Sequence, residues 1–514
     1  MRKRILAIIL GLVTAVCGFA GCVNNSGKHS EDEVHVKIWS SGTGVQFLIN
    51  AVEAFNAKNT GYTVKYEDSS NNKTIVSDFG KEDIDNTDIW MYSIDAIPTL
   101  ISKYAEPLND VLDTTYEGES KTIKDKFEKN FLNELVYEDG NYYSLSYGGG
   151  WYGIVYNQEI IDGVNFSVPR TTIELEALVV ALYESKDVNM KPWISFKDEG
   201  YWNHMLGIWQ AQYDTLDYVN NTFWKLDGGA EDPAPSKNVF IKEDGRYEAL
   251  KALERIMKPD YIVDGSNSNT HTTSQTRFLH DEAVMMLNGS WLLNEMRNTS
   301  GAKDKFVMMK SPVISSIVEK CPTIDGYDGG EPDEELAALI DAVDAVASAN
   351  DVPLTGEGYE VSREDATMVY NARNLMATNF DAHGIIIPKY ATSKAGAKEF
   401  LKYFYSDENL ESYWRTTQLP MMINYSNGEG PDMKDWNEWS VSQQKFSAMA
   451  IPVYTLKRNC SPIFTLGGAT PYGTQTLMKN VTSRGEYKDA ATTWSEIVKE
   501  INSQWKNYKT NAQL

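Results

Sequence analysis

Residues 141–157, Asn-Tyr-Tyr-Ser-Leu-Ser-Tyr-Gly-Gly-Gly-Trp-Tyr-Gly-Ile-Val-Tyr-Asn, decide how this chain is organised. The segments on either side of the three glycines, 142–147 and 151–157, are rich in aromatic and β-branched residues, which favours extended strands. Glycine tolerates large changes of backbone dihedral angle. Residues 148–150 therefore predict either a hinge between two parts of the molecule or a loop without motion.

The same glycines match the spacing of a dinucleotide fingerprint through Gly148, Gly150 and Gly153. The surrounding residues argue against that site. Trp151 and Tyr152 would crowd a pyrophosphate, and no helix follows whose N-terminus could hold one.

Upstream of the glycines, the pattern predicts an α/β lobe. Residues 34–39 alternate like a strand, and Thr43 with Gln46 forms a capping box at the start of an amphipathic helix. Two further strands are expected at 62–66 and 87–92. A strand, helix, strand unit of this kind is parallel and right-handed.

Downstream, a second α/β region is expected, with helices at 173–183 and 201–213 and a segment 278–291 that ends in Asn-Gly-Ser-Trp. An acidic stretch at 312–380 contains at least one helix. The chain then shows a buried strand, a helix and a closing amphipathic helix, at 384–388, 397–404 and 494–505.

Length and charge limit the function. A chain of 514 residues favours two or more domains. Its formal net charge of -24 argues against nucleic acid, which needs a basic face, and makes a neutral ligand the easier fit. The charge also has a simpler reading, which is solubility outside the cell.

Signatures of catalysis and metal binding are missing from the sequence. It contains no HExxH, GxSxG or CxxC motif, and its six histidines never stand at i, i+4 spacing. We therefore expect no enzymatic activity, no metal and no cofactor. A carboxylate pair for glycoside hydrolysis stays open, because 72 acidic residues produce such pairs by chance.

The N-terminus predicts export. Arg2-Lys3-Arg4 precedes an apolar block, 5–16, and small residues lead to Cys22. The pattern resembles a bacterial lipoprotein signal, with 1–21 as the signal peptide, Cys22 as the lipidated residue and 22–33 as a polar tether. The alternative is an ordinary signal peptide in which Cys22 is incidental. Two cysteines remain in the body, Cys321 and Cys460, either as a disulfide or as two free thiols.

The order and spacing of several segments resemble the family 1 extracellular solute-binding proteins of ABC importers. The matching segments span nearly the whole mature chain: 36–40, 88–90, 143–157, 278–291 and 384–404, with Pro420 beyond. The stretch 312–380 is longer than the family minimum, and we interpret it as an elaboration of the second lobe.

The resemblance implies a two-lobed Venus flytrap fold in which the chain crosses between the lobes near 146–150, 383–387 and 425–432. The implied boundaries are 34–147 plus 385–428 for the first lobe and 148–384 plus 429–514 for the second.

Candidate ligand-binding residues follow from strand ends and from the family. Ligands bind beyond the carboxyl ends of parallel strands, and aromatic rings cover the faces of sugars while polar groups bond their rims. The candidates are Ser41, Thr43, Tyr92, Ser93, Asp95, Trp151, Tyr152, Trp202 and Trp291. Trp291 is favoured because the family's equivalent tryptophan commonly stacks on the ligand. Core packing is the alternative for Trp291 and Trp202, and helix capping is the alternative for Thr43 and Asp95.

These inferences predict a lipid-anchored substrate-binding component of an ABC importer. It would hold a neutral oligosaccharide between its lobes and deliver it to the permease subunits as a monomer. We expect it on the outer face of the cytoplasmic membrane of a Gram-positive cell, held there through Cys22, because a tethered binder makes best sense where no outer membrane confines a soluble one. The alternatives are a surface glycan adhesin or sensor without transport, and a binder of a non-sugar solute.

The anchor gives the first testable prediction. Cys22→Ala should release the protein from the cell and slow uptake while leaving sugar affinity unchanged, because acyl chains contribute membrane affinity, about 0.8 kcal/mol per buried methylene, and no ligand contact. Cell fractionation and calorimetry on the released protein measure the two effects. Loss of sugar binding in this variant would contradict the separation of anchor and binding site.

Overall fold

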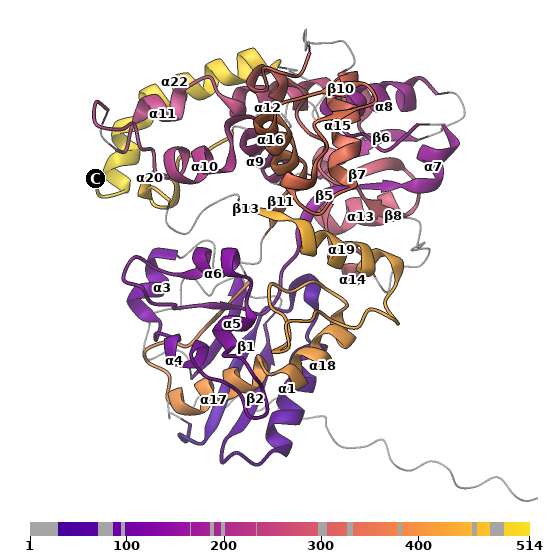
Figure 1. The fold of residues 1–514 in the computed structure, drawn as a ribbon. Coiled ribbons are helices and arrows are strands. Elements are labelled where there is room, and N and C mark those ends of the chain that lie inside the picture. Colours follow the sequence, from indigo (N-terminus) through magenta and orange to yellow (C-terminus); the bar gives the residue numbers. More distant parts are fainter. Residues whose placement is uncertain are drawn as a thin grey trace, which may run out of the picture.

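The computed structural model describes twelve stretches of the chain: 29–69, 86–93, 98–164, 166–185, 190–196, 201–232, 234–296, 306–325, 333–378, 383–454, 460–472 and 488–514. The predicted signal peptide, Cys22 and Asp95 lie outside these stretches. Figure 1 shows two α/β bodies, one above the other, each built around its own sheet. This arrangement confirms the predicted α/β fold class. We call the bodies around the first and second sheets lobe 1 and lobe 2.

Lobe 1 is built on a five-stranded sheet in the order β2-β1-β3-β12-β4. Strand β1 pairs in parallel with β2, as predicted, and also with β3, whereas β12 runs antiparallel to β3 and β4. The elements of lobe 1 are β1 (Glu33–Ile38), η1 (Ser41–Thr43), α1 (Gln46–Ala57), β2 (Thr63–Asp68), β3 (Ile89–Ser93), α3 (Pro98–Tyr104), α4 (Asn109–Leu112), α5 (Ile123–Lys126), α6 (Lys129–Leu135), β4 (Leu145–Ser146), β12 (His383–Ile386), α17 (Lys394–Phe404) and α18 (Asp407–Thr417).

The predicted capping box at the start of α1 is wrong. Helix α1 begins at Gln46, its N-cap is Val45, and no side chain caps it. Thr43 instead ends the 3-10 turn η1, and Gly44, with φ at +73°, turns the chain before the helix starts. The capping residue therefore stands too far from the helix to bond its first amides.

Lobe 2 is built on a second sheet in the order β13-β11-β5-β7-β6, with β8 paired to β5. Its elements as far as β7 are β5 (Trp151–Asn157), α7 (Gln158–Gly163), α8 (Thr172–Glu184), β6 (Lys191–Ile194), α9 (Tyr201–Asp214), α10 (Leu216–Tyr218), the π-helical turn η2 (Val219–Phe223), α11 (Lys237–Ile241), α12 (Gly245–Ile256), η3 (Pro259–Tyr261), η4 (Ser266–Ser268), α13 (His271–Leu279) and β7 (Ala283–Gly289).

The remaining elements of lobe 2 include the predicted elaboration and the C-terminal helix. They are α14 (Leu292–Glu295), β8 (Phe306–Met308), η5 (Ser315–Lys320), α15 (Glu334–Asp344), η6 (Ala349–Asp351), β9 (Thr355–Gly356), β10 (Tyr359–Glu360), α16 (Arg363–Asn374), β11 (Leu375–Thr378), α19 (Glu438–Met449), β13 (Ile451–Tyr454), α20 (Pro462–Thr465) and α22 (Ala490–Asn511). Among the described residues, none of the helices combines the length and apolar character needed to span a bilayer.

The chain passes between the two sheets at the predicted glycine segment, between β4 and β5. Gly149 has φ at +145°, a conformation that favours glycine, and the buried Tyr147 donates its hydroxyl to the Trp39 carbonyl at 3.1 Å. A second passage separates β11 from β12. Since β12 begins at His383, residues 383–384 pair in the first sheet, whereas the predicted boundary gave them to lobe 2.

One apolar cluster joins the lobes. It begins in the core of lobe 1 and continues through the fully buried Trp151 to Phe196, Met286 and Met376 of lobe 2. The passages between the sheets are therefore packed against a continuous core.

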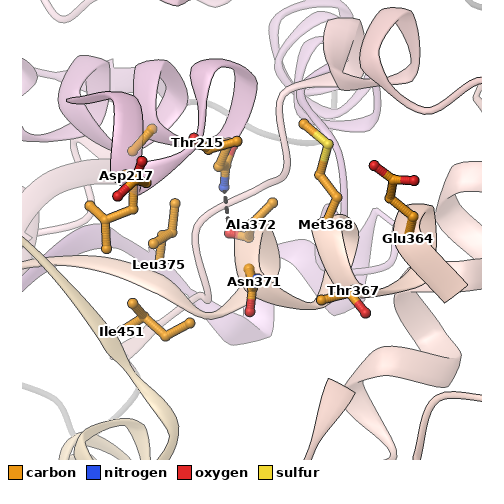
Figure 2. Close-up of a pocket in the computed structure, with 12 residues that line it drawn as sticks. Thr215, Asp217, Glu364, Thr367, Met368, Asn371, Ala372, Leu375 and Ile451 are labelled. Atoms are coloured by element: carbon orange, nitrogen blue, oxygen red, sulfur yellow. Dashed lines mark hydrogen bonds between the residues drawn. The ribbon is translucent and has the colours of Figure 1, made fainter. Parts of the chain in front are cut away.

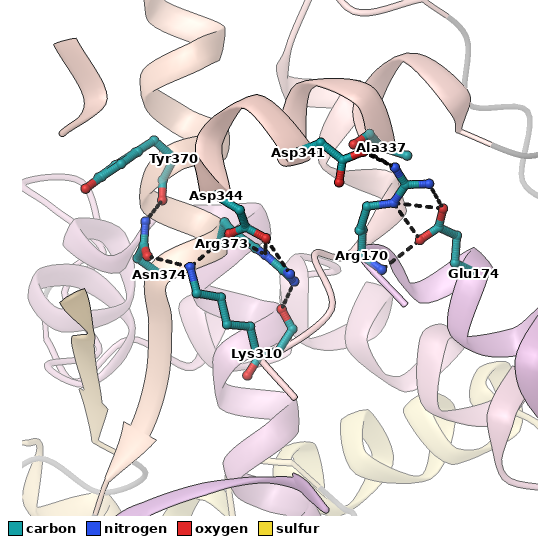
Figure 3. Close-up of polar contacts among 10 residues, drawn as sticks. Arg170, Glu174, Lys310, Ala337, Asp341, Asp344, Tyr370, Arg373 and Asn374 are labelled. Atoms are coloured by element: carbon teal, nitrogen blue, oxygen red, sulfur yellow. Dashed lines mark hydrogen bonds and ion pairs between the residues drawn. The ribbon is translucent and has the colours of Figure 1, made fainter. Parts of the chain in front are cut away.

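Ion pairs hold the helices of the elaboration together and tie them to residues 310–311, which directly precede it (Figure 3). Asp344 at the end of α15 accepts from Arg373 of α16 and from Lys310, with shortest N···O distances of 2.8 Å each. Arg373 also donates to the Ser311 carbonyl at 3.3 Å. Burial alone would raise the pKa of Asp344, but the two cations outweigh it and hold the pKa below its usual value.

Arg373→Met should lower the free energy of unfolding at pH 7 by about 1–3 kcal/mol, because the Ser311 carbonyl and the Asp344 carboxylate lose a buried donor. The lowered pKa of Asp344 means that this stabilisation is present above the carboxyl's ordinary pKa of 3.8 and is lost as the pH falls through its folded pKa. The gap between wild type and variant should therefore narrow below about pH 4. Urea titrations of the wild type and Arg373→Met at pH 7 and below about pH 4 measure this difference in free energy of unfolding.

Arg415→Met is the matched control, because Arg415 is 76 % exposed and pairs only with Glu411 on the same helix among its described ion pairs. An exposed pair of this kind contributes about 0.5 kcal/mol or less. Equal losses in the two variants would contradict the proposed role of the Arg373 pair.

Candidate functional site

The lobes meet at Trp291, which stands two residues after the end of β7. Three glycines surround it: Gly289 on β7, Gly150 in the passage between lobes, and Gly42 in η1 of lobe 1. A Cβ atom at Gly289 would come within 2.3 Å of the Trp291 ring, and one at Gly42 within 2.9 Å of its Cβ. Backbone from both lobes therefore approaches one tryptophan more closely than any side chain would permit.

Aromatic rings of lobe 2 pack around Trp291. Tyr152 meets its ring edge-on at 4.9 Å and 89°, and Tyr201 does so at 6.2 Å and 80°. His204 stacks on Tyr152 at 3.5 Å, and burial lowers the pKa of His204 to about 3, so its imidazole is neutral. We call Tyr152, Tyr201, His204 and Trp291 the junction aromatic cluster. Trp291 is 7 % exposed in this conformation.

A carboxylate lies beside this cluster. Glu295 follows Trp291 by one turn, and its Oε1 would be 3.1 Å from a Cβ at Gly42 of lobe 1. Its Oε2 accepts from the Gln275 amide at 2.5 Å and stands 3.8 Å from Nδ1 of His271. Burial raises the pKa of Glu295 to about 7, against the opposing effect of the Gln275 bond, and burial lowers the pKa of His271 to about 4. At neutral pH the nearby imidazole is therefore uncharged.

A direct hydrogen bond also links the lobes here. Asn294 of α14 donates its amide to the Thr417 carbonyl at the end of α18, at 3.0 Å. Helix α14 thus presents Asn294, Glu295 and the preceding Trp291 to lobe 1.

Trp151 lies in the wall behind the junction. It is fully buried, and its indole N–H donates to Ser447 of α19 at 2.7 Å. Trp439 of the same helix donates to the Ser290 carbonyl at 2.9 Å. The two indoles hold α19 against the strand ends of lobe 2, and a ligand contact by Trp151 stays a prediction.

The candidates from lobe 1 occupy strand ends and turns. Tyr92 is buried, and its hydroxyl bonds Ser69. Thr43 is half-buried, with its methyl 3.5 Å from where a Cβ of Gly148 would stand. Ser93 ends β3, and Ser41 begins η1 with its side chain outside the described part. Asp95 lies outside the described residues, so nothing tests it.

Trp202 points elsewhere in lobe 2. It is buried and packs edge-on against Trp193 at 5.4 Å. Its neighbour Tyr201 joins the junction aromatic cluster instead. Sequence reasoning missed Tyr201, His204 and Glu295, although helical spacing puts Tyr201 and His204 on one face of α9 and Glu295 one turn beyond Trp291.

The half-buried Trp39 was also missed. It stands just after β1 and stacks on His383 of β12 at 5.9 Å and 8°. Its strand-end position was the available signal. No group of three or more His, Cys, Asp or Glu side chains that could hold a metal ion occurs in the part of the chain that the structure describes. Cys321 and Cys460 are free thiols here, and burial raises the pKa of each to about 12.

Comparison with known proteins agrees with this architecture. The sequence profile of the family described as bacterial extracellular solute-binding protein matches residues 50–439. No curated protein sequence matches the chain.

Among solved structures, the apo form of RafE from Streptococcus pneumoniae is similar at a TM-score of 0.61 and 13 % identity, over 93 % of this chain and 99 % of that one. The GacH receptor of Streptomyces glaucescens, solved with and without acarbose, is similar at a TM-score of 0.57 and 14 % identity, over 93 % of this chain and 99 % of that one. RafE in complex with raffinose is similar at a TM-score of 0.60 and 12 % identity, over 92 % of this chain and 99 % of that one. At these identities the likeness establishes the fold.

Glu295→Gln should change how stability depends on pH. Because the folded pKa is raised, the native state keeps a proton that the unfolded chain loses above pH 4.5, so this group costs the wild type stability as the pH rises from 4.5 to about 7. The Glu295→Gln variant has no carboxyl group to titrate at this position. Its free energy of unfolding should therefore rise relative to that of the wild type between pH 4.5 and about 7. Thermal unfolding of both proteins at several pH values measures the difference, and His271 contributes equally to both.

Glu411→Gln is the control, since Glu411 is 60 % exposed in its pair with Arg415. A constant offset between wild type and Glu295→Gln from pH 4.5 to 8 would show that Glu295 titrates normally.

Proposed function

Because this chain belongs to the bacterial extracellular solute-binding proteins, we propose that it is a receptor that binds a carbohydrate between its two lobes. The junction aromatic cluster carries this proposal. It brings Tyr152, Tyr201 and Trp291 of lobe 2 to the point where the η1 turn of lobe 1 approaches.

The chemistry of this junction suits a neutral oligosaccharide. Pyranose rings expose C–H groups on their faces, which pack on aromatic rings, and hydroxyls on their rims, which bond amides and carboxylates. Glu295 and Asn294 follow Trp291 on α14 and supply such groups, and Thr43 supplies a hydroxyl beside Gly148 in the passage between the lobes. The net charge of -24 disfavours an anionic ligand. Two of the similar structures were solved in complex with raffinose and with acarbose, which supports a carbohydrate ligand for this chain as well.

Binding would act by shifting the lobes toward the closed form, since a ligand that touches both lobes favours the state in which both contacts exist. The permease of an ABC importer would then recognise the closed receptor. The anchor at Cys22 would keep the receptor at the outer face of the membrane, near that permease. The leader sequence and the family resemblance support these steps.

A panel of neutral mono- and oligosaccharides, titrated calorimetrically into the mature protein, tests the proposal. One class should bind, and Trp291→Ala should raise its Kd about tenfold or more, since the ligand loses an aromatic face. Trp291→Phe keeps a ring at the junction and should lose less. Absence of binding across all neutral glycans would contradict the proposal.

Tyr183→Ala is the matched control, because Tyr183 is 44 % exposed on α8 and packs against Tyr261 away from the junction. Its affinity should equal that of the wild type. Thermal unfolding of each variant separates lost binding from lost folding, and shortened oligosaccharide after incubation would point to hydrolysis.

A further inference from the structure

Lobe 2 contains a cavity, apart from the junction, with a volume of about 510 Å³. It lies between the turn that joins α9 to α10, one face of α16, and the first residues of β11 and β13 (Figure 2). Helix α16 belongs to the predicted elaboration at 312–380, so that insertion supplies one wall. The volume falls within the range of small-molecule sites, roughly 300–1,000 Å³.

The cavity lies away from the junction within the same sheet. In the order β13-β11-β5-β7-β6, its strands β13 and β11 stand on one side of β5, and Trp291 follows β7 on the other. A ligand in this cavity would therefore leave the junction aromatic cluster untouched.

The charged residues among the described lining of the cavity are all acidic. Asp217 and Glu364 both line the cavity, and none of its described lining residues is Lys, Arg or His. Figure 2 shows the two carboxylates on opposite sides of the view, with Asn371 between them. One oxygen of Asp217 accepts from Asn221 at 2.7 Å, which leaves the other for a further donor.

The surface between the carboxylates is largely apolar and fixed. Leu216, Met368, Leu375 and Ile451 contribute it. The amide of Gln212 holds the wall together: its Nε2 donates to the Ala372 carbonyl at 3.0 Å, and its Oε1 accepts from the Ile314 amide at 2.8 Å. Gln212 is thus a structural brace.

We propose that this cavity binds a linear aliphatic diamine, with one ammonium group at Asp217, the other at Glu364, and the hydrocarbon chain over the apolar surface between them. Ammonium groups pair with carboxylates, and methylene groups gain by leaving water for such a surface. A neutral chain of the same length would leave both carboxylates unpaired. A monoamine would satisfy only one.

Calorimetric titration of the mature protein with cadaverine, pentylamine and pentanediol tests the site. Cadaverine should bind at one site per chain, pentylamine more weakly, and pentanediol without measurable heat. Asp217→Asn and Glu364→Gln should each raise the Kd for cadaverine about two- to fivefold, as expected for an exposed ion pair. Diamines from propane to octane should show an optimum length set by the spacing of the carboxylates.

Glu357→Gln is the control for unspecific attraction to an acidic protein, because it removes one exposed charge from the same elaboration outside the cavity. It should leave the Kd unchanged. Three results would each overturn the proposal: no binding of any diamine, equal affinity for pentanediol, or equal effects of Glu357→Gln and Glu364→Gln. Trp291→Ala should bind cadaverine as the wild type does, so failure of the sugar panel and failure of this site are distinguishable.

Discussion

The close approach of backbone to Trp291 is the constraint on which the arrangement of the lobes depends. Gly42, Gly150 and Gly289 come from a turn of lobe 1, from the passage between lobes and from the end of β7. A Cβ at Gly42 or Gly289 would collide with Trp291, and one at Gly150 would collide with the Ser290 hydroxyl, 2.1 Å away, and crowd the indole. The indole fills the place where these three segments meet. Since packed interiors tolerate little change of volume, the close contact of Gly42 with Cβ and Cγ of Trp291 limits how η1 can lie relative to β7.

Much of the secondary structure was readable from periodicity. The parallel β1-α1-β2 unit and the helices α8 and α9 lie within a few residues of the predicted ranges, because each carries its own hydrophobic pattern. The start of α1 was not readable in the same way. Thr43 and Gln46 have the right spacing for a capping box, but Gly44 between them adopts a left-handed turn. Residue spacing alone does not predict that turn.

The junction was predictable in part. Trp291 was predicted from the family resemblance and Tyr152 from its place at the glycine joint between the lobes, and the structure places their rings together. Tyr201, His271 and Glu295 come from α9, α13 and α14, and only tertiary packing brings these helices to one place. Trp202 shows the converse, since one position along α9 turns a side chain from the junction into the core of lobe 2. The lobe boundaries and the ligand contacts stay predictions.

The glycine at position 42 has a mechanical consequence. A single methyl group there would act as a wedge between the lobes, because its carbon would stand 2.9 Å from Cβ of Trp291. Such a wedge would raise the energy of the arrangement in which η1 contacts Trp291, and each 1.4 kcal/mol of that cost would lower the population of this arrangement about tenfold relative to arrangements without the contact. A ligand that binds only the arrangement with this contact would lose apparent affinity for the altered chain, although the substitution removes no side chain.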